Sequence, residues 1–370
     1  MRVGLDISQA VKRKVRGIAR YIREILPHLL AQSSKTRDGF EPALYVRGDR
    51  IFRKAPLADL APGAPVRWLP ARLYLPGRGL DLFHSFGNYL PAYSPVPLTF
   101  TAHDFRALDL DAAPPGSRLH RNVARSAGVI CLTEHGRSRL LHHFPDYEPG
   151  RLAVVPHGVD HDRFRPREAA QALATASRHG LRPPYILQLG SWFPHKNLEL
   201  SVRAFAESRA RREGLRLAFV GGGASQDYRR ALDELAGSLG VRDQIDWVED
   251  VPADDIPAVL AASSCLLQPS RYEGFALPLL EAMAVGTPGV VSDSSCLPEV
   301  TGGAWPVVAQ DNAEALAQEL DALVFDEARR AITISAGLAR ASQFTWAESA
   351  RKTLTFFRHV AGLGAKTSSS

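Results

Sequence analysis

Two glutamates and the segment between them are the most informative feature of this chain. Glu273 is followed by Gly274, and an apolar run then leads to Glu281, directly after the strand-like stretch 265–268. Carboxylate oxygens accept hydrogen bonds from hydroxyls, and a helix that opens near Pro278 turns its backbone N–H groups toward phosphate. This spacing suits a ligand with hydroxyls at both ends and a diphosphate between them, which is the outline of a nucleotide-sugar. The structural alternative is a surface loop followed by an amphipathic helix with one solvated glutamate.

Two strand-to-helix turns carry further candidates for phosphate contact. Lys196 and Asn197 lie in such a turn in the second half of the chain, where an ammonium would partner the leaving phosphate and Asn197 would cap the following helix. Gly17 lies at the mouth of the first strand-to-helix loop, where it would let the backbone approach a phosphate. The three-glycine spacing of a dinucleotide fingerprint is missing, so Gly17 as a plain turn residue stays open.

His103 follows the strand-like stretch 98–101 and is expected at the carboxyl edge of the first sheet, with Asp104 beside it. Ligands of parallel α/β sheets bind at that edge. A lone histidine is more often structural than catalytic, so both interpretations stay open. The sequence has no P-loop, no nucleophile elbow and no cluster of His, Cys and Asp at metal spacing. No bound metal and no cofactor are therefore expected.

Composition and charge limit the class of protein. The 370 residues, 45% of them hydrophobic and 23% charged, predict a soluble globular chain of two domains. The sequence shows no signal-peptide core and no run of about 18 apolar residues, and its three cysteines lack metal or redox spacing. These features predict a cytoplasmic location. Lys and Arg outnumber Asp and Glu over residues 1–166, which favours an anionic partner. Nucleic acid is not expected, because no recognition motif and no basic stretch with interleaved aromatics occurs.

Short β-type runs alternate with helical patterns along both halves, which predicts α/β domains with helices on both faces of parallel sheets. The expected strands are 3–6, 43–46, 81–84, 98–101, 129–131 and 152–155, then 185–189, 215–220, 245–248, 265–267 and 289–291. The clearest helices are 18–30 and 135–144, and residues 160–184 have the composition of a linker. We expect domains over 1–165 and 166–345, a final helix over 346–361 and a disordered tail over 362–370.

Five motifs in order carry a resemblance to a known family: Arg16–Tyr21, His103–Asp104, His157–Asp160, Lys196–Asn197 and Glu273–Glu281. Together they resemble the retaining glycosyltransferases of the GT-B type, in glycosyltransferase family 4, group 1. That family includes bacterial mannosyl- and rhamnosyltransferases of O-antigen and capsule assembly. The resemblance covers essentially the whole chain. It implies two Rossmann-like, doubly wound domains that face a central cleft, the first binding the acceptor and the second the nucleotide-sugar, with the final helix crossing back to the first domain.

The resemblance also implies roles for single residues. Glu273 would bind hydroxyls of the transferred sugar, Glu281 would bind ribose, and Lys196, with Asn197 beside it, would neutralise the leaving diphosphate. The remaining donor-site positions are Gly17, Ser191, Gly274, Phe275, Ala276 and Leu277, and His103 would line the reacting face of the sugar. Two of these depart from the family pattern. Ser191 stands where many relatives have arginine, and Ala276 replaces a usual glycine, which is tolerable if its φ stays negative.

The function implied by the resemblance is retaining, metal-independent transfer of a hexose from a nucleoside-diphosphate sugar to a glycan or lipid-linked glycan of a surface polysaccharide. GDP-mannose or a GDP-linked 6-deoxy sugar such as GDP-rhamnose is the favoured donor, and a UDP-sugar is the alternative. A nucleotide-sugar-binding protein without transfer activity and an epimerase remain as rivals. Six basic residues gather around the first loop and helix: Lys12, Arg13, Lys14, Arg16, Arg20 and Arg23. They could contact the anionic inner face of the plasma membrane, or they could simply be solvated charges on the helix, and both interpretations stay open.

Overall fold

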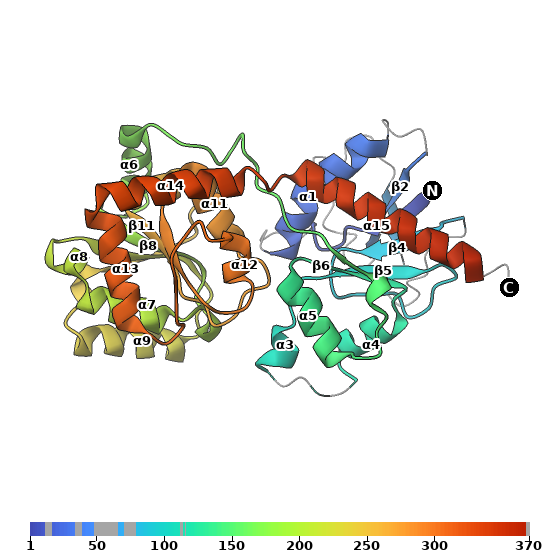
Figure 1. Ribbon diagram of the computed structural model, residues 1–370, viewed down its shortest axis with the longest axis horizontal. Coiled ribbons are helices and arrows are strands. Elements are labelled where there is room, and N and C mark those ends of the chain that lie inside the picture. Colours follow the sequence, from blue (N-terminus) through green and yellow to red (C-terminus); the bar gives the residue numbers. More distant parts are fainter. Residues whose placement is uncertain are drawn as a thin grey trace. The chain divides into compact units, whose positions relative to one another are not determined.

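The computed structural model describes residues 1–11, 17–33, 39–47, 66–69, 79–111, 114 and 116–367. The chain divides into two compact units (Figure 1). Unit 1 contains residues 1–158 and 345–370, and unit 2 contains residues 159–344. The boundary that the sequence suggests, between residues 165 and 166, falls just inside unit 2. The final helix belongs to unit 1.

Unit 1 is built on a parallel sheet with the strand order β3-β2-β1-β4-β5-β6-β7. Its strands are β1 (Arg2–Asp6), β2 (Glu41–Arg47), β3 (Val66–Leu69), β4 (Leu82–Ser85), β5 (Leu98–Ala102), β6 (Gly128–Cys131) and β7 (Leu152–Val154). One face carries α1 (Ile18–Ser33) and α15 (Trp346–Thr367), and the other carries α3 (Arg106–Asp109), α4 (Arg118–Arg125) and α5 (Glu134–His143) (Figure 1). The short 3-10 helix η2 (Pro149–Arg151) precedes β7.

Unit 2 repeats this plan with the strand order β10-β9-β8-β11-β12-β13, again parallel. Its strands are β8 (Tyr185–Ser191), β9 (Arg216–Gly222), β10 (Ile245–Glu249), β11 (Cys265–Gln268), β12 (Gly289–Ser292) and β13 (Val307–Val308). One face carries α7 (Leu198–Glu207), α8 (Arg209–Arg212), α9 (Gln226–Ser238) and α13 (Ala313–Phe325) (Figure 1). The other carries α6 (Ala169–Arg178), α11 (Leu277–Val285) and α14 (Glu327–Ala341) (Figure 1). The helix α10 (Ile256–Ala261) packs against α6 and α11. Shorter pieces are η3 (Pro194–Lys196), η4 (Arg242–Gln244), η5 (Ala253–Asp255) and α12 (Leu297–Thr301).

The burial of these elements explains why the sequence forms them. In α1 the apolar side chains Tyr21, Ile22, Ile25 and Leu29 recur at helical spacing and are all buried. The central strands β4 and β5 are buried along their whole length, as expected of parallel strands covered on both faces. The prediction of two Rossmann-like α/β domains with parallel sheets is confirmed.

Three details differ from the sequence-based expectation. The sequence suggests no strand at β3 or β13, and β13 is only two residues long. The linker interpretation of 160–184 is wrong over α6, which begins where the Glu168 carboxylate accepts from the N–H groups of Ala170 and Gln171 at 2.9 and 2.7 Å. Finally, α15 extends to Thr367, beyond residue 361, where the sequence suggests that the final helix ends and a disordered tail follows.

The basic residues near the first helix are only partly described. Lys12, Arg13, Lys14 and Arg16 lie outside the described residues. Arg23 donates through Nε and a terminal nitrogen to the Ala10 carbonyl at 3.1 and 2.9 Å, and Arg20 lies 3.8 Å from the Glu24 carboxylate. Arg23 therefore holds the backbone at Ala10, and membrane contact stays a prediction.

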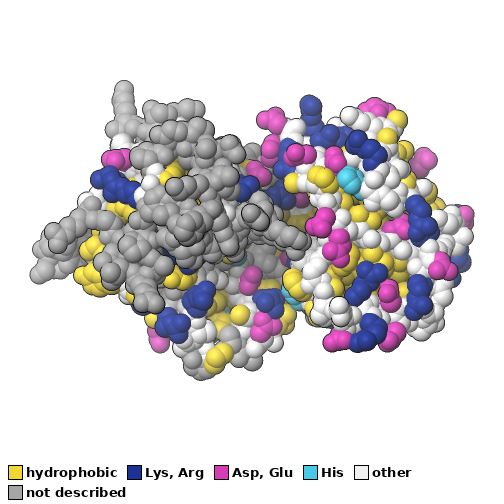
Figure 2. All heavy atoms as spheres, turned by 180° about the vertical axis from the view of Figure 1, so that it is seen from behind, with side chains coloured by type: hydrophobic (Ala, Val, Ile, Leu, Met, Phe, Trp, Pro, Cys, Tyr) yellow, Lys and Arg dark blue, Asp and Glu magenta, His cyan; other side chains and the backbone are white. Residues whose placement is uncertain are grey.

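Figure 2 shows one face of the molecule, on which basic and acidic side chains are interleaved over unit 2 without a broad area of one sign. On this face, the described surface of unit 2 offers no extended footprint for a polyanion. Within the described residues no helix combines the length and the apolar character needed to cross a membrane.

Candidate functional site

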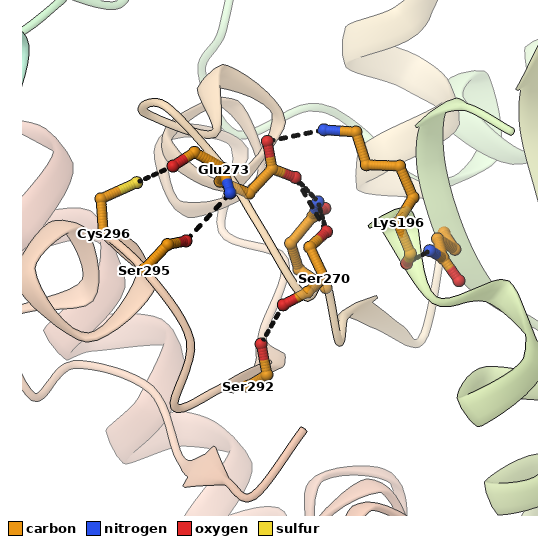
Figure 3. Close-up of polar contacts among 8 residues, drawn as sticks. Lys196, Ser270, Glu273, Ser292, Ser295 and Cys296 are labelled. Carbon is orange, nitrogen blue, oxygen red and sulfur yellow. Dashed lines mark hydrogen bonds and ion pairs between the residues drawn. The ribbon is translucent and has the colours of Figure 1, made fainter. Parts of the chain in front are cut away.

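Lys196 and Glu273, far apart in the sequence, meet in unit 2 (Figure 3). Lys196 Nζ donates to Glu273 Oε2 at 2.6 Å, and the two side chains are 18% and 7% exposed. Lys196 ends η3, which follows β8, and Glu273 lies in the loop that follows β11. The strands β8 and β11 are parallel neighbours, so both loops leave the sheet at its carboxyl edge. This is the edge at which α/β sheets bind ligands.

The second oxygen of the Glu273 carboxylate is held from within the same loop. Glu273 Oε1 accepts from Gln268 Nε2 at 2.6 Å and from Ser270 Oγ at 2.8 Å. With the bond from Lys196, these contacts use three of the roughly four lone-pair positions of a carboxylate. Counting partners in the described ranges alone, one position on Oε2 remains for the hydroxyl of a ligand, as the predicted contact with a sugar requires.

The backbone of this loop is fixed as well (Figure 3). The Glu273 N–H donates to Ser295 Oγ at 2.9 Å, and the Cys296 thiol donates to the Glu273 carbonyl at 3.3 Å. Ser292 Oγ donates to the Ser270 carbonyl at 2.6 Å. The carboxylate therefore stands on a loop that is tied to the segment following β12, which limits its freedom before any ligand binds.

The Lys196 ammonium has N–H groups that are not used by its bond to Glu273. An ammonium has three N–H bonds, and in the part of the chain that the structure describes Nζ makes a hydrogen bond only to Glu273. The backbone of Lys196 is held by Gln188, whose Nε2 donates to the Lys196 carbonyl at 2.8 Å while its Oε1 accepts from Ser201 Oγ at 2.7 Å. A fixed lysine with two N–H groups left over can contact the oxygens of a phosphate.

Asn197 has a different structural role from the predicted one. It occupies the first position before α7 with φ of 56°, but its side chain makes no capping hydrogen bond. Instead Nδ2 donates to the Pro269 and Gln310 carbonyls at 3.0 and 2.8 Å. The prediction that Asn197 caps the helix is therefore wrong, and its amide ties three loops at the carboxyl edge together.

Ala276 also departs from expectation. Its φ is 65°, in the left-handed region. Alanine is expected to be tolerable at this position only with a negative φ. The Ala276 carbonyl accepts from the Leu279 N–H at 3.0 Å, so this conformation opens α11. A left-handed L-residue costs roughly 1–2 kcal/mol, which explains why glycine suits the position.

The other donor-site positions are distributed around these residues. Gly274 and Leu277 are half-buried and Phe275 is buried, at the start of α11, and Ser191 is half-buried at the end of β8. Glu281 lies within α11 and is 1% exposed. The roles assigned to these residues toward diphosphate and ribose stay predictions.

In unit 1, Gly17 and His103 both contact Tyr21. Gly17 precedes α1 with φ of 47°, and its carbonyl accepts from the Tyr21 N–H at 3.0 Å. The His103 ring packs edge-on against the Tyr21 ring with centroids 5.1 Å apart. The structure thus brings these two predicted positions to the same edge of the sheet in unit 1.

The protonation of His103 follows from its surroundings. Burial lowers its pKa, opposed by the Phe86 carbonyl and by Asp104. His103 Nε2 lies 2.7 Å from the Phe86 carbonyl, so this nitrogen carries the proton and donates it. The imidazole is therefore neutral near neutral pH, with a lone pair on Nδ1.

Sequence reasoning did not single out a further histidine of this region. His84 Nδ1 lies 2.9 Å from Thr99 Oγ1 and Nε2 lies 3.2 Å from Thr101 Oγ1, and burial lowers the pKa of His84 to about 3. His157 stacks on Tyr21 at 4.7 Å, and burial holds its pKa well below the usual range. The position of His84 inside an apolar strand gave no signal of chemistry, because its partners lie on the next strand.

Across the described ranges no group of three or more His, Cys, Asp or Glu side chains could hold a metal.

Comparison with known proteins adds family information. The model "Glycosyltransferase Family 4" matches residues 15–163, and "Glycosyl transferases group 1" matches residues 172–340. The chain is 28% identical over 293 residues to O-antigen chain mannosyltransferase B of Escherichia coli, covering 75% of this chain and 74% of that one. It is 31% identical over 228 residues to the GDP-mannose-dependent alpha-(1-6)-phosphatidylinositol monomannoside mannosyltransferase of Mycolicibacterium smegmatis, covering 59% and 58%.

Among solved structures, Anabaena Alr3699/HepE in complex with UDP and glucose matches with a TM-score of 0.70 and 16% identity, over 99% of this chain and 100% of that one. At this identity the likeness shows the fold.

Proposed function

The chain belongs to the glycosyltransferases of family 4 and group 1, which use nucleotide sugars, and from this membership we propose that it is a retaining hexosyltransferase acting on a growing, lipid-linked surface polysaccharide. The observation that carries the proposal is the Lys196–Glu273 pair, at 2.6 Å. Its ammonium has donors to spare for a diphosphate, and its carboxylate has a lone pair to spare for a sugar hydroxyl. The predicted roles of Ser191, Asn197 and Gly274–Leu277 in holding the donor are part of this proposal.

In the proposed reaction the bond between the anomeric carbon and the diphosphate oxygen breaks, and a bond from the same carbon to the acceptor oxygen forms on the same face. The acceptor hydroxyl gives its proton to the departing phosphate. Lys196 stabilises the charge that develops on the leaving diphosphate, and Glu273 orients the sugar through a hydroxyl. The neutral His103 lines the reacting face of the sugar, and no bound metal or further cofactor takes part.

The favoured donor is GDP-mannose or a GDP-linked 6-deoxy sugar such as GDP-rhamnose. Two relatives with mannosyltransferase names support mannose, and one of these names specifies GDP-mannose. A UDP-sugar is the second candidate, because a structural neighbour was solved with UDP and glucose.

A two-step experiment tests the proposal. Thermal unfolding in the presence of GDP-, UDP-, ADP- and dTDP-sugars identifies the donor, because a bound ligand stabilises the folded state by mass action. The radiolabelled donor is then incubated with a lipid-linked glycan acceptor, with and without a chelator. Transfer of label with retained anomeric configuration, unaffected by the chelator, is expected. Stabilisation without transfer indicates a binding protein, and a changed donor sugar without acceptor indicates an epimerase.

Peripheral contact with an anionic membrane extends this proposal to the acceptor. Basic residues near an anionic surface are attracted by about 1 kcal/mol each, and salt screens this attraction. We expect the protein to co-sediment with anionic vesicles at low salt, and a variant with Lys12, Arg13 and Lys14 changed to Ser to sediment less. Equal sedimentation of both proteins, or none at low salt, would mean that the acceptor is reached from solution.

A further inference from the structure

Arg47 is a buried cation in unit 1 that has no acidic partner among the described residues. It ends β2, is 8% exposed, and its guanidinium carbon lies 3.9 Å above the centre of the Tyr89 ring. Arg47 Nε is buried without a hydrogen-bond partner, and in the described part of the chain the Arg47 side chain makes no ion pair. Arginine is rarely buried to this extent unless paired, and a ring contact alone replaces only part of its lost hydration.

A second guanidinium faces the same ring. Arg118, the first residue of α4, is exposed and lies 5.8 Å from the centre of the Tyr89 ring. The loop that carries Tyr89 is held to α4 by Arg125, which donates to the Pro91 and Ala92 carbonyls at 2.5 Å each. Two guanidinium groups therefore share one aromatic ring on a loop that is fixed in place.

The position of Arg47 is set by the neighbouring strand end. The Arg47 N–H donates to Ser8 Oγ at 2.9 Å, and the Ser8 N–H donates to Asp6 Oδ1 at 2.8 Å. Asp6 is paired with Tyr45 in the register of β1 and β2, so Arg47 stands at the carboxyl edge of the sheet. The Asp6 carboxylate accepts from backbone, and it forms no ion pair with Arg47. The cation is held in place, and among the described residues no carboxylate neutralises it.

We propose that Arg47, Tyr89 and Arg118 form a subsite for a phosphate group of the acceptor. The planar fork of arginine matches phosphate oxygens in pairs, and two cations match a doubly charged group better than a single carboxylate. The subsite rests on the proposed function, because it places the acceptor on unit 1, and it narrows the acceptor class to phosphate esters. The phosphate can come from a lipid-linked diphosphate or from a soluble sugar phosphate.

The kinetic test compares two acceptors with the same sugar, one carried on a short alkyl diphosphate and the other an uncharged alkyl glycoside. Arg47→Gln is expected to raise KM for the diphosphate acceptor at least tenfold. Its kcat, its KM for the donor and its KM for the uncharged acceptor should stay at wild-type values. Arg118→Gln should shift the same KM in the same direction by less. Arg137→Gln, on α5, is the matched control and should change none of them. Equal KM changes with both acceptors would overturn the proposal.

A binding test does not depend on transfer. In a Lys196→Ala background, which weakens the donor site, the affinities for inorganic pyrophosphate, for a sugar 1-phosphate and for the alkyl diphosphate are measured with and without Arg47→Gln. The affinity for at least one of them should fall at least tenfold, and the ligand most affected identifies the source of the phosphate.

The two tests fail in different ways. If no acceptor is glycosylated but Arg47→Gln still weakens phosphate binding, the proposed function fails and the subsite stands. Unchanged affinity for every phosphate ligand refutes the subsite. Should Arg47→Gln not fold, the exposed Arg118→Gln is measured in its place, and an unchanged affinity and KM there refute the subsite equally.

Discussion

Glu273 has a bond from Lys196 on one oxygen and bonds from Gln268 and Ser270 on the other, so its carboxylate is oriented before a ligand arrives. Preorganised polar groups act on a transition state without rearrangement during the reaction. The same bonds explain why the pair tolerates burial, since each charge is compensated where it stands.

Glu273→Gln keeps the shape of the side chain and removes its charge. We expect binding of the nucleoside diphosphate to be retained and kcat/KM to fall by the equivalent of roughly 1.5–3 kcal/mol, the scale of a hydrogen bond to a charged group. Steady-state kinetics and calorimetric titration of the nucleotide measure the two quantities. Wild-type turnover in this variant would remove Glu273 from the site.

Ala276 adopts φ of 65° at the start of α11. Glycine would relieve roughly 1–2 kcal/mol of strain but would lose about 0.5–1 kcal/mol through its freer unfolded chain. Ala276→Gly should therefore raise the free energy of unfolding slightly, by at most about 1.5 kcal/mol, in urea denaturation. Ala276→Val is the matched comparison, because a β-branched side chain is strained further in this region, and it should destabilise. A clear loss of stability in the glycine variant would contradict this assignment of strain.

At the scale of the elements, the neighbouring strands β4 and β5 carry a histidine whose two ring nitrogens both contact threonine hydroxyls. Both strands are buried along their length, and burial lowers the pKa of His84 to about 3. The stability that β4 and β5 give to unit 1 therefore depends on a ring that stays neutral.

The sign of the resulting pH dependence follows from the lowered pKa. The unfolded chain takes up a proton near pH 6.5 and the folded chain does not, so this stability is complete above about pH 6.5 and is lost as the pH falls toward 3. For each such histidine, the free energy of unfolding falls by up to about 1.4 kcal/mol for each pH unit below about pH 6.5. His84→Asn should make the decline between pH 6.5 and 5 shallower in urea unfolding. An unchanged slope would show that His84 is not the group responsible.

At the scale of the whole molecule, the two units differ in how the chain builds them. Unit 2 is one continuous segment, residues 159–344, whereas unit 1 is completed by residues 345–370. Unit 2 contains its own apolar core between the sheet and the helices α7, α9 and α13. The Lys196–Glu273 pair and all of its hydrogen-bond partners also lie in unit 2.

Residues 159–344 expressed alone should therefore fold cooperatively and bind the nucleoside diphosphate, but they should not transfer sugar. Urea unfolding and calorimetric titration check the first two points, and the transfer assay checks the third. A segment that unfolds without cooperativity would show that unit 1 is needed for its stability.

The sequence predicts the two sheets well, because short β-type runs that alternate with helical patterns are what parallel strands covered by helices on both faces require. It cannot show that Lys196 and Glu273 form a pair, since only the neighbouring strands β8 and β11 bring them together. The left-handed φ of Ala276 and the side-chain contacts of Asn197 depend likewise on surrounding loops. Arg47 carries no motif, and only its burial without an acidic partner draws attention to it.

In the proposed reaction, Lys196 holds the diphosphate of the donor while His103 acts on turnover. Calorimetric titration of GDP into wild type, Lys196→Ala and His103→Ala, together with the rate of sugar transfer, separates these two roles. Lys196→Ala removes a hydrogen bond to a charged group, which is worth roughly 1.5–3 kcal/mol. The affinity of this variant for GDP should therefore be about tenfold to a hundredfold lower than that of wild type. His103→Ala should bind GDP as wild type does and transfer sugar more slowly. Wild-type affinity in Lys196→Ala, or an equal loss of affinity in both variants, would contradict the account.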